Sequence, residues 1–251
     1  MRLLLHSSSN PALDLALEEA IHIGVEEGSS PPTWRLWQAA RPALVLGTGQ
    51  VATRELDLDA AQANQVPILR RHSGGGAVLI GPGALNYSAF YRMADLTGAE
   101  TITGAMRAAL QPLLAVLERW GLPATLAGLS DVVVHSPDGL IRKIAGNAQA
   151  RKRYALVVHG TLLASPNWDL LERLLRFPSR PPIYRAGRSH RDFLSSLAKL
   201  NAPHELPSLA QAMVGELALS DIPTEPTLEE CDRAQTLLAE KYALPSWTMR
   251  R

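Results

Sequence analysis

Apolar residues recur every three or four positions in three segments, which predicts helices over residues 11 to 24 or 28, 101–120 and 227–242. Asn10-Pro11 is typical of a helix N-terminus, and Thr227-Leu-Glu-Glu230 has the spacing of a capping box. Pro112 lies inside the second segment. Because an interior proline removes a backbone hydrogen bond, we expect a kink or two abutting helices there.

Shorter runs rich in β-branched and aromatic residues predict strands over residues 34–37, 43–46, 66–69, 131–135, 141–144 and 154–163. Turns at Arg41-Pro42 and Ser136-Pro-Asp-Gly139 separate neighbouring strands, and a short helix is expected over residues 56–64. From Asn167 the chain is mostly helical. Strands fill the middle of the chain while helices lie at its ends and between strand groups, which favours an α+β domain over regular βαβ alternation.

Composition adds limits to this picture. With 251 residues, 46% hydrophobic and 20% charged, the chain can form one large domain, or one domain with a small appendage. A net charge of +1 provides no global field that would recruit nucleic acid or a membrane surface. The single cysteine, Cys231, excludes an internal disulfide, and Leu3-Leu-Leu5 is too short for a signal peptide or a membrane span. We therefore expect a soluble, cytoplasmic protein with no nucleic-acid or membrane partner.

The most informative stretch, residues 69–90, places two arginines, a serine and Gly74-Gly-Gly76 before two apolar runs. Free N–H groups in a glycine loop can face an anion, and Arg70 and Arg71 supply permanent cations beside it. The alternative is a β-hairpin with a flexible loop and two solvated arginines. The loop is not a Walker A motif, since no Gly-Lys-Ser/Thr follows. It is not a dinucleotide fingerprint either, since Leu79 occupies the position of the third glycine.

Two further stretches carry residues suited to chemistry. Lys143 is followed by Gly146-Asn-Ala-Gln149, whose small residues would let a ligand approach the backbone. A lysine between apolar neighbours alternatively reaches solvent along its own stem or pairs with an acid. His159 lies in the last strand-like run, where a satisfied core histidine is the alternative to a catalytic one.

Together these stretches resemble the signature of the lipoate–protein ligase A family, within the biotin/lipoate protein ligase superfamily. The central resemblance is carried by Arg70-Arg71-x-Ser73-Gly-Gly-Gly-Ala-Val78 with Leu85-Asn-Tyr-Ser88, by Lys143-Ile-x-Gly146-Asn-Ala-Gln149, and by His159-Gly-Thr-Leu-Leu163. The same pattern, in the same order, is matched by Asn10-Pro-x-Leu-Asp-Leu-Ala-Leu-Glu-Glu19, the Trp37 strand leading to Gly47-x-x-Gln50, and Lys241-Tyr242 with Trp247.

The resemblance implies an α+β fold with a mixed β-sheet flanked by helices. It implies a single catalytic domain over residues 1–251, helical from about 167 to 251. The implied activity is ATP-dependent attachment of lipoate, through a lipoyl-adenylate, to a lysine of a lipoyl domain, with ATP and Mg²⁺ as cofactors. Octanoate is the alternative acyl substrate. The expected partners are lipoyl domains of 2-oxoacid dehydrogenase complexes, the glycine cleavage H protein or a similar lipoate-binding protein.

The resemblance also implies roles for individual residues. Lys143, matching the family's essential lysine, would be the catalytic residue and bridge carboxylate and α-phosphate oxygens. Contacts to the nucleotide and adenylate are expected from Arg70, Ser73, Gly74, Gly75, Gly76, Ala77, Asn86, Asp131, Lys143 and Thr161. Contacts to the lipoyl chain are expected from Trp37, Arg70, Val78, Gly146 and His159. Asp131 would also help to hold Mg²⁺, a hard cation that prefers oxygen ligands.

The chain departs from the family pattern in two places. Ile80-Gly-Pro82 stands where many ligases carry a His-Asp pair, and Ser130 replaces an asparagine before the aspartate, which changes the expected acyl and metal contacts. The basic run Arg180–Arg191 resembles a segment of a ligase-like subgroup. It would order over bound nucleotide, dock an acidic lipoyl domain or form a solvated loop.

No segment is long enough for the C-terminal accessory domain of self-sufficient ligases. We therefore expect either a separate accessory ligase subunit or a chain that works mainly as a transferase. Octanoyltransferases of this superfamily pass the acyl group through a cysteine thioester, but Cys231 falls inside the capped C-terminal helix, which disfavours that route. The alternatives are a lipoyl or octanoyl transferase with a pre-activated acyl donor, and a non-catalytic acyl-binding subunit.

Overall fold

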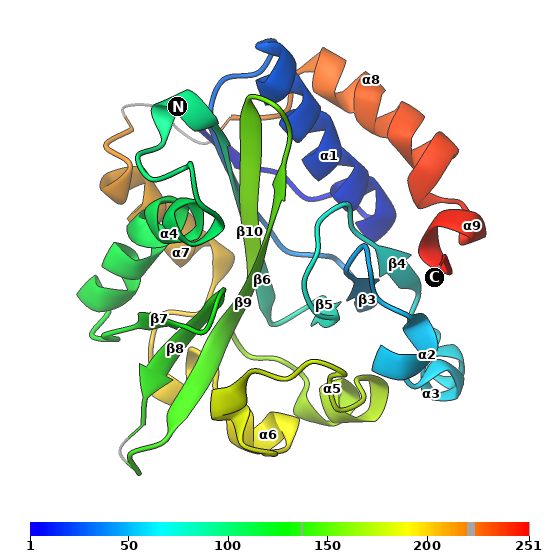
Figure 1. The fold of residues 1–251 in the computed structure, drawn as a ribbon, viewed down its shortest axis with the longest axis vertical. Helices are drawn as coiled ribbons and strands as arrows, with labels where there is room; N and C mark the ends of the chain where they lie inside the picture. The colour runs from blue at the N-terminus through cyan, green and yellow to red at the C-terminus, as the bar shows by residue number, and fades with distance from the viewer. Residues whose placement is uncertain (137, 220–223, 251) are drawn as a thin grey trace.

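The computed structural model describes residues 1–136, 138–219 and 224–250. Its central sheet has seven strands in the order β1-β2-β6-β10-β9-β8-β7 (Figure 1). The β1–β2 pair is parallel and every other neighbouring pair is antiparallel. In sheet order the strands are β1 (Arg2–Leu5), β2 (Thr33–Trp37), β6 (Ala84–Arg92), β10 (Ala155–Leu163), β9 (Ile141–Arg151), β8 (Asp131–His135) and β7 (Thr125–Ala127).

A smaller sheet has the order β4-β3-β5, with β3 parallel to β4 and antiparallel to β5. Its strands are β4 (Ile68–Arg70), β3 (Ala43–Leu46) and β5 (Val78–Ile80). The strands predicted on either side of Arg41-Pro42 therefore exist but do not pair with each other, because β2 belongs to the central sheet. For the same reason the simple hairpin alternative for residues 69–90 is wrong, since β5 and β6 lie in different sheets.

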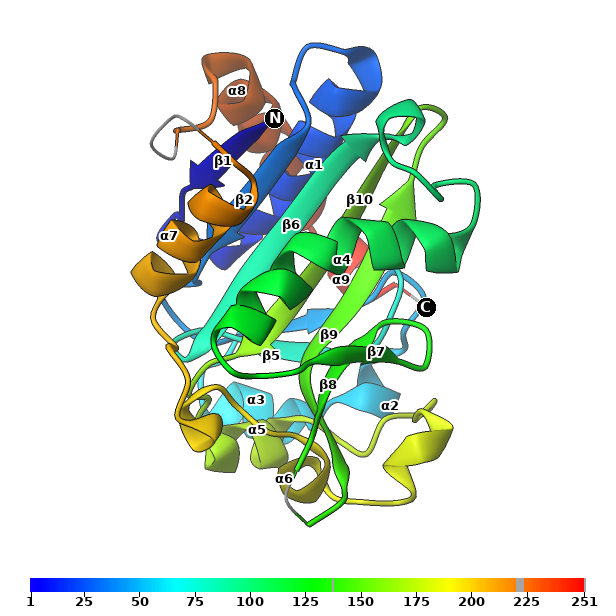
Figure 2. The ribbon, with the colours of Figure 1, turned by 90° about the vertical axis from the view of Figure 1, so that its left-hand side faces the viewer.

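Helices cover both faces of the central sheet, which confirms the predicted α+β architecture. Helices α4 (Ile102–Arg119) and α7 (Leu206–Glu216) lie on one face, as Figure 2 shows, and their apolar side chains form a core with that face. Helix α1 (Pro11–Glu27) lies on the other face, and α8 (Leu228–Leu237) packs outside α1. No helix within the described ranges is long and apolar enough to cross a membrane.

Helix α1 begins and ends where the sequence predicts. The Asn10 side chain accepts a hydrogen bond from the N–H of Ala12 at 3.0 Å. The chain leaves the helix at Gly28, whose φ of +85° suits glycine. The Thr227 capping box of α8 is also confirmed: Glu230 N–H donates to the Thr227 hydroxyl, and the Glu230 carboxylate accepts from the Thr227 N–H.

Helix α4 is one uninterrupted helix, so the alternative of two abutting helices at Pro112 is wrong. The proline removes one intrahelical hydrogen bond, at a cost of roughly 3 kcal/mol. Leu110, Leu113 and Leu117 are fully buried on the same helix, and each contributes about 1.5–3 kcal/mol through burial. Packing against the sheet therefore outweighs the local cost.

Strand β9 continues to Arg151, beyond the end predicted at residue 144. Residues 146–149 consequently lie within the sheet opposite β10, not in a loop after a strand. The predicted turn over residues 136–139 includes Pro137, which is outside the described residues.

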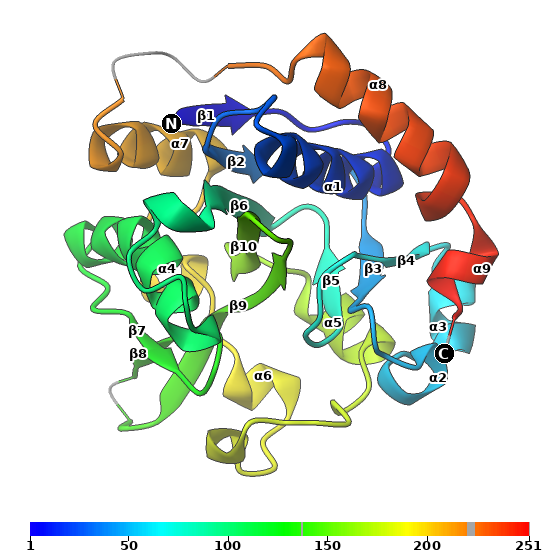
Figure 3. The same cartoon turned by 45° about the horizontal axis from the view of Figure 1, so that its top comes forward.

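Short helices lie next to the small sheet, with α9 beside β4, except for α6, which contacts α5 and β9 (Figure 3). The predicted helix over residues 56–64 is confirmed as α3, and helical segments follow Asn167 as expected. These elements are α2 (Ala52–Glu55), α3 (Leu58–Ala63), α5 (Trp168–Leu174), α6 (His190–Phe193) and α9 (Pro245–Thr248).

Candidate active site

A cavity of about 1250 Å³ lies between the α1-facing side of the central sheet and the small sheet. Strands β6, β9 and β10 supply one wall, and β3 and β5 supply another. Residues 48–51, 74–77 and 178–185 complete the walls. The predicted site residues that line it are Trp37, Gly74, Gly75, Gly76, Ala77, Val78, Asn86, Asp131, Lys143, Gly146, His159 and Thr161. The structure thus brings together residues from all three sequence stretches.

Lys143 presents a cation to this cavity. Its Nζ lies 2.7 Å from Oδ1 of Asp131, and its side chain is 25% exposed. The Tyr184 hydroxyl donates to the other oxygen of Asp131 at 2.7 Å. Burial, reinforced by Asp131, raises the pKa of Tyr184, so the phenol stays protonated and donates. A Cβ at Gly146 would stand only 2.6 Å from Nζ, so glycine there leaves the space that the ammonium occupies.

The glycine loop is held by Arg71. Its guanidinium donates to the carbonyl oxygens of Gly74 and Gly76 and to the Ser73 hydroxyl, the last at 3.0 Å. Gly75 has a φ of +87°, and a Cβ there would meet Arg71 at 2.8 Å. Among the described residues, none accepts a hydrogen bond from the N–H groups of residues 74–77. Such a loop can bind an anion through its backbone.

Arg70, predicted to contact both nucleotide and lipoyl chain, does not line the cavity. Its side chain is fully buried and donates only to backbone carbonyl oxygens. The acceptors include Gly47 at 2.7 Å, Gln50 at 2.8 Å, Thr248 at 2.9 Å and Arg250 at 3.0 Å. Side chains alternate across a strand, so Arg70 turns toward the C-terminal segment while Arg71 turns toward the loop. Through these hydrogen bonds Arg70 links residues 47–50, at the edge of the cavity, to residues 247–250.

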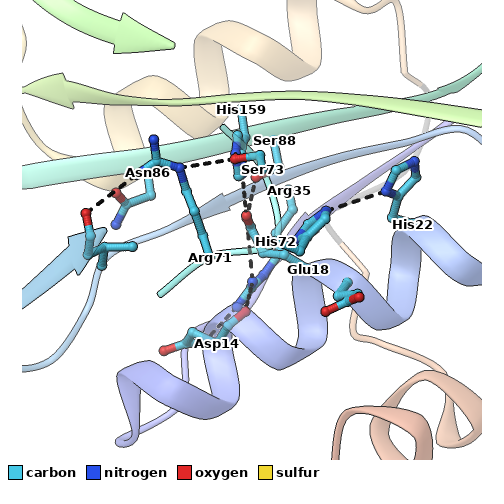
Figure 4. Close-up of polar contacts among 12 residues, drawn as sticks. Asp14, Glu18, His22, Arg35, Arg71, His72, Ser73, Asn86, Ser88 and His159 are labelled. Atoms are coloured by element: carbon cyan, nitrogen blue, oxygen red, sulfur yellow. Dashed lines mark hydrogen bonds and ion pairs between the residues drawn. The ribbon is translucent and has the colours of Figure 1, made fainter. Parts of the chain in front are cut away.

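Ser73, predicted as a nucleotide contact, is 1% exposed and stands behind the cavity wall. Its Oγ lies 2.5 Å from Nε2 of His159, and Nδ1 of His159 lies 2.7 Å from Oε2 of Glu18 (Figure 4). Glu18 also accepts from the indole N–H of Trp37 at 3.0 Å and from the Ser88 hydroxyl. Burial by itself raises the pKa of Glu18, but His159 and Arg35 lower it overall, so Glu18 is a carboxylate.

Glu18 was not predicted as a site residue. Together with Asp14 it occupies a stripe of α1, spaced by four and three, that continues through Ile21 and Val25. The sequence signal that could have identified Glu18 is the presence of two carboxylates on the helix face that otherwise carries buried aliphatic residues. Asp14 pairs with Arg35 at 2.7 Å behind the site, where both side chains are fully buried.

Thr161 and Asn86 lie side by side on β10 and β6, where the Thr161 hydroxyl donates to the Asn86 side-chain oxygen at 2.8 Å. The Asn86 amide nitrogen is buried and has no hydrogen-bond partner within the described residues. Trp37, Val78 and Ile80 supply apolar wall. This end of the cavity suits an aliphatic chain.

Part of the basic segment predicted at residues 180–191 forms one wall of the cavity. Arg180 and Arg185 line it. Arg188 donates to the carbonyl oxygens of Ile141 and Tyr184, at 2.9 Å each. The segment from Arg180 to Arg188 is therefore anchored to β9, next to Lys143.

Asp131 is the residue predicted to hold Mg²⁺, and both of its carboxylate oxygens have protein partners. One carboxylate oxygen faces the Lys143 ammonium and the other accepts from Tyr184. In residues 1–136, 138–219 and 224–250, no three Asp, Glu, His or Cys side chains gather closely enough to hold a metal ion.

Cys231 lies on α8, away from the cavity. Its neighbours there include Leu13 and Leu17 of α1. Burial and nearby carboxylates raise the pKa of the thiol, which opposes thiolate formation. Since this is the chain's single cysteine, no cysteine lines the cavity.

Comparisons with known proteins agree with this arrangement. The model of the lipoyl protein ligase A/B catalytic domain matches residues 10–218. An octanoyltransferase LipM from Symbiobacterium thermophilum is 31% identical over 260 residues, covering 95% of this chain and 94% of that protein.

Two solved structures share the fold. One is a bi-partite lipoate protein ligase and its E2 lipoyl domain from Thermoplasma acidophilum, with a TM-score of 0.83, 27% identity, and coverage of 99% of this chain and 95% of that one. The other is a lipoate-protein ligase A bound with ATP, with a TM-score of 0.76, 27% identity, and coverage of 99% and 98%. The chain belongs to the lipoyl protein ligase A/B catalytic-domain family.

Proposed function

We propose that this protein attaches lipoate to a lysine of a lipoyl domain in two steps, using ATP. The lipoate carboxylate attacks the α-phosphate of ATP, and pyrophosphate leaves to give lipoyl-adenylate. The lysine amine then attacks the acyl carbonyl, and AMP leaves. The observation that carries this proposal is that the Lys143 ammonium shares one cavity with the N–H groups of residues 74–77, which have no acceptor in the part of the chain that the structure describes.

The first step brings a carboxylate to a phosphate, so catalysis requires positioning and compensation of negative charge. Asp131 holds the Lys143 ammonium at 2.7 Å, and Gly146 leaves room for it. In this position the ammonium would bridge carboxylate and phosphate oxygens. The backbone of residues 74–77, braced by Arg71, would hold the adenylate phosphate. The relative bound with ATP supports nucleotide binding in this fold.

Octanoyl transfer from a pre-activated donor is the second candidate, favoured by the relative named as an octanoyltransferase. The proposed acyl pocket beside Trp37 and Val78 would accept either a lipoyl or an octanoyl chain. A route through a cysteine thioester is opposed by the position of Cys231 on α8. Transfer would then have to proceed directly from donor to lysine.

We further propose that the acceptor is a lipoyl domain and that a separate accessory subunit assists activation. The Thermoplasma relative, a bi-partite ligase studied with its E2 lipoyl domain, supports both parts. The reaction would take place in the cytoplasm, with which a single free thiol is compatible.

The test incubates purified protein with apo lipoyl domain and either lipoate plus ATP or octanoyl carrier protein, each with and without a candidate accessory subunit. Mass spectrometry follows the acyl adduct on the lysine. We expect a lipoyl adduct that requires ATP. An adduct formed only from octanoyl carrier protein would show that the protein is a transferase and not a ligase. If no combination gives an adduct, the remaining candidate is a non-catalytic acyl-binding subunit.

Cys231→Ser is the matched control. It removes the chain's one thiol without touching the cavity, so we expect unchanged adduct formation. Loss of transfer in this variant would contradict the direct route and support a thioester.

A further inference from the structure

The opening of the cavity carries two large aliphatic side chains that lie in water. Ile183 is 100% exposed and Leu129 is 75% exposed, and both residues line the cavity. A residue that lines a cavity and is still exposed stands at its opening. One exposed aliphatic side chain is common on any protein surface, whereas a group of them beside a cavity marks an interaction site. The reaction proposed above makes use of neither side chain.

The two aliphatic residues come from segments that contact each other. Leu129 lies in the turn between β7 and β8, and Ile183 lies more than fifty residues further along the chain. A Cβ added at Gly128 would be 3.7 Å from Cε1 of Tyr184. The residue before Leu129 therefore lies beside the residue after Ile183. The exposed proline at position 181 also lines the cavity and extends the same apolar surface.

The segment that carries Ile183 is fixed on both sides of it. Before Ile183, the N–H and the hydroxyl of Ser179 both donate to the carboxylate of Glu55. After it, the Tyr184 hydroxyl donates to Asp131 at 2.7 Å. The backbone thus holds the isoleucine side chain in water next to the carboxylate that pairs with the proposed catalytic ammonium. A partner that covers such a side chain gains the free energy of apolar burial.

The same opening is positively charged. Three exposed arginines line the cavity, namely Arg54, Arg176 and Arg180. Within residues 1–136, 138–219 and 224–250, none of the three takes part in an ion pair. The acidic residues that line the cavity are all buried, namely Glu18, Glu55 and Asp131. The opening therefore combines apolar contact with positive charge that no exposed carboxylate of the described cavity wall offsets.

The chemistry inside the cavity identifies what this surface meets. A lysine carries its amine on a flexible stem of four carbons. An acceptor lysine can therefore reach an acyl group beside Lys143 only when the protein that carries it comes into contact with the opening. The surface around the acceptor lysine then faces Leu129, Ile183 and the arginines. An apolar centre with a charged periphery is the usual composition of a protein–protein interface, and positive charge favours an acidic partner.

We propose that Leu129, Ile183 and the three arginines form the docking surface for the acceptor domain. The inference rests on the proposed acyl transfer to lysine, and it specifies the acceptor's surface: apolar and acidic side chains next to the modified lysine. The aliphatic pair supplies affinity through burial. The arginines accelerate the encounter, because charge complementarity acts mainly on the rate of association and is screened by salt.

The test measures transfer from synthetic lipoyl-adenylate to apo lipoyl domain, with kcat and the KM for the acceptor determined separately. For Ile183→Ala and Leu129→Ala we expect a KM about fivefold higher or more, with kcat unchanged. Arg180→Glu should raise KM severalfold at low salt, and this increase should shrink at high salt. The KM increase of the two alanine variants should persist at high salt, because no charge is lost.

A second measurement separates docking from activation. Hydroxylamine is small enough to enter the cavity without docking, and its nitrogen attacks the acyl carbonyl of lipoyl-adenylate to give lipoyl hydroxamate and AMP. With ATP and lipoate as substrates, all three variants should form hydroxamate at the wild-type rate. Loss of hydroxamate in Arg180→Glu would assign that arginine to the nucleotide and overturn its docking role. An Ile183→Ala defect that appears only in activation with an accessory subunit would make that subunit the occupant, against the proposal.

Two matched controls remove the same kinds of side chain elsewhere. Leu228 on α8 is 84% exposed, Arg107 on α4 is exposed, and neither residue lines the cavity. Leu228→Ala and Arg107→Glu should keep the wild-type KM for the acceptor. A KM increase in the controls as large as that in the opening variants would indicate a nonspecific effect and refute the assignment of this surface.

Direct binding of apo lipoyl domain, measured by fluorescence anisotropy, distinguishes failure of the docking surface from failure of the proposed function. Transfer by the wild type, with binding and KM unchanged in Ile183→Ala and Leu129→Ala, would refute the docking surface alone. Binding that these variants weaken, in a wild type that transfers no acyl group, would refute the proposed function and retain the surface. Absence of both binding and transfer in the wild type would refute both.

Discussion

Gly146→Ala tests the placement of the Lys143 ammonium without altering the lysine or its partner. A Cβ added at Gly146 would lie 2.6 Å from Nζ and 2.8 Å from Cε of Lys143, and 4.0 Å from Oδ1 of Asp131. Ordinary contact begins at 3.4 Å, so the ammonium must retreat by 0.8 Å (3.4 − 2.6) while Asp131 keeps its position. The atom displaced is the end of a flexible side chain, so the fold can absorb the change.

The expected effect on catalysis is large. A displacement of about 1 Å in a group that positions reacting atoms can lower the rate by roughly 10²-fold. At 1.36 kcal/mol per tenfold, that is about 2.7 kcal/mol of transition-state stabilisation. The free energy of unfolding should change by less than about 1 kcal/mol, since alanine restricts the unfolded chain more than glycine does.

The assay is lipoate-dependent exchange of pyrophosphate into ATP, which reports the activation step, together with thermal unfolding. Gly215→Ala in α7 is the matched control, because its added Cβ meets nothing within 4 Å. That variant should exchange pyrophosphate at the wild-type rate. Exchange by Gly146→Ala within threefold of wild type would refute the proposed role of the ammonium's position.

Three further predictions concern Lys143, Arg70 and the buried His22. Lys143→Ala should lose pyrophosphate exchange while still binding acyl-adenylate in a calorimetric titration; retained exchange would remove the role given to Lys143. Arg70→Ala should lower the free energy of unfolding by about 3 kcal/mol, because several hydrogen bonds to a charged group are lost; an unchanged urea midpoint would contradict the anchoring of residues 47–50 to residues 247–250. His22 has a folded pKa of about 4, lowered chiefly by burial, against 6.5 when exposed. The unfolded chain therefore binds more protons between these values, and stability should fall by up to about 3 kcal/mol as pH drops from 6.5 to 4. Urea unfolding should show a smaller fall for His22→Gln, and an equal fall in both proteins would contradict the neutral buried ring.

Local features followed from the sequence because their causes lie within a few residues. Asn10 caps α1 and Gly28 ends it, and Thr227 caps α8, as the local pattern predicts. Combined in order, the three motif stretches also indicated the family, and the structure places Lys143 and His159 in one cavity.

Pairing between strands was decided by long-range contacts. Both strands around Arg41-Pro42 were predicted, but β2 pairs with β1 and β6 while β3 pairs with β4 and β5. Propensity describes one strand at a time and contains no information about its neighbour.

The roles of the two adjacent arginines were also decided by tertiary structure. In the sequence both arginines lie beside the glycine loop, and the family resemblance assigned ligand contacts to Arg70 alone. In the structure Arg70 anchors the C-terminal segment and Arg71 braces the glycine loop. Neighbouring side chains on a strand point to opposite sides, and only the packing around the strand determines what each side meets.

The sequence by itself thus determined the capped ends of α1 and α8, most of the strand positions, the glycine loop and the family, because capping, periodicity and motif spacing are local properties. The strands β1 and β7 were not predicted. Only the tertiary structure decided that Glu18 of α1, Ser73 after β4 and His159 of β10 form one array, across separations of 141 and 86 residues. The physical reason is that a buried carboxylate must find a partner wherever packing brings one, and packing joins residues that the sequence keeps apart.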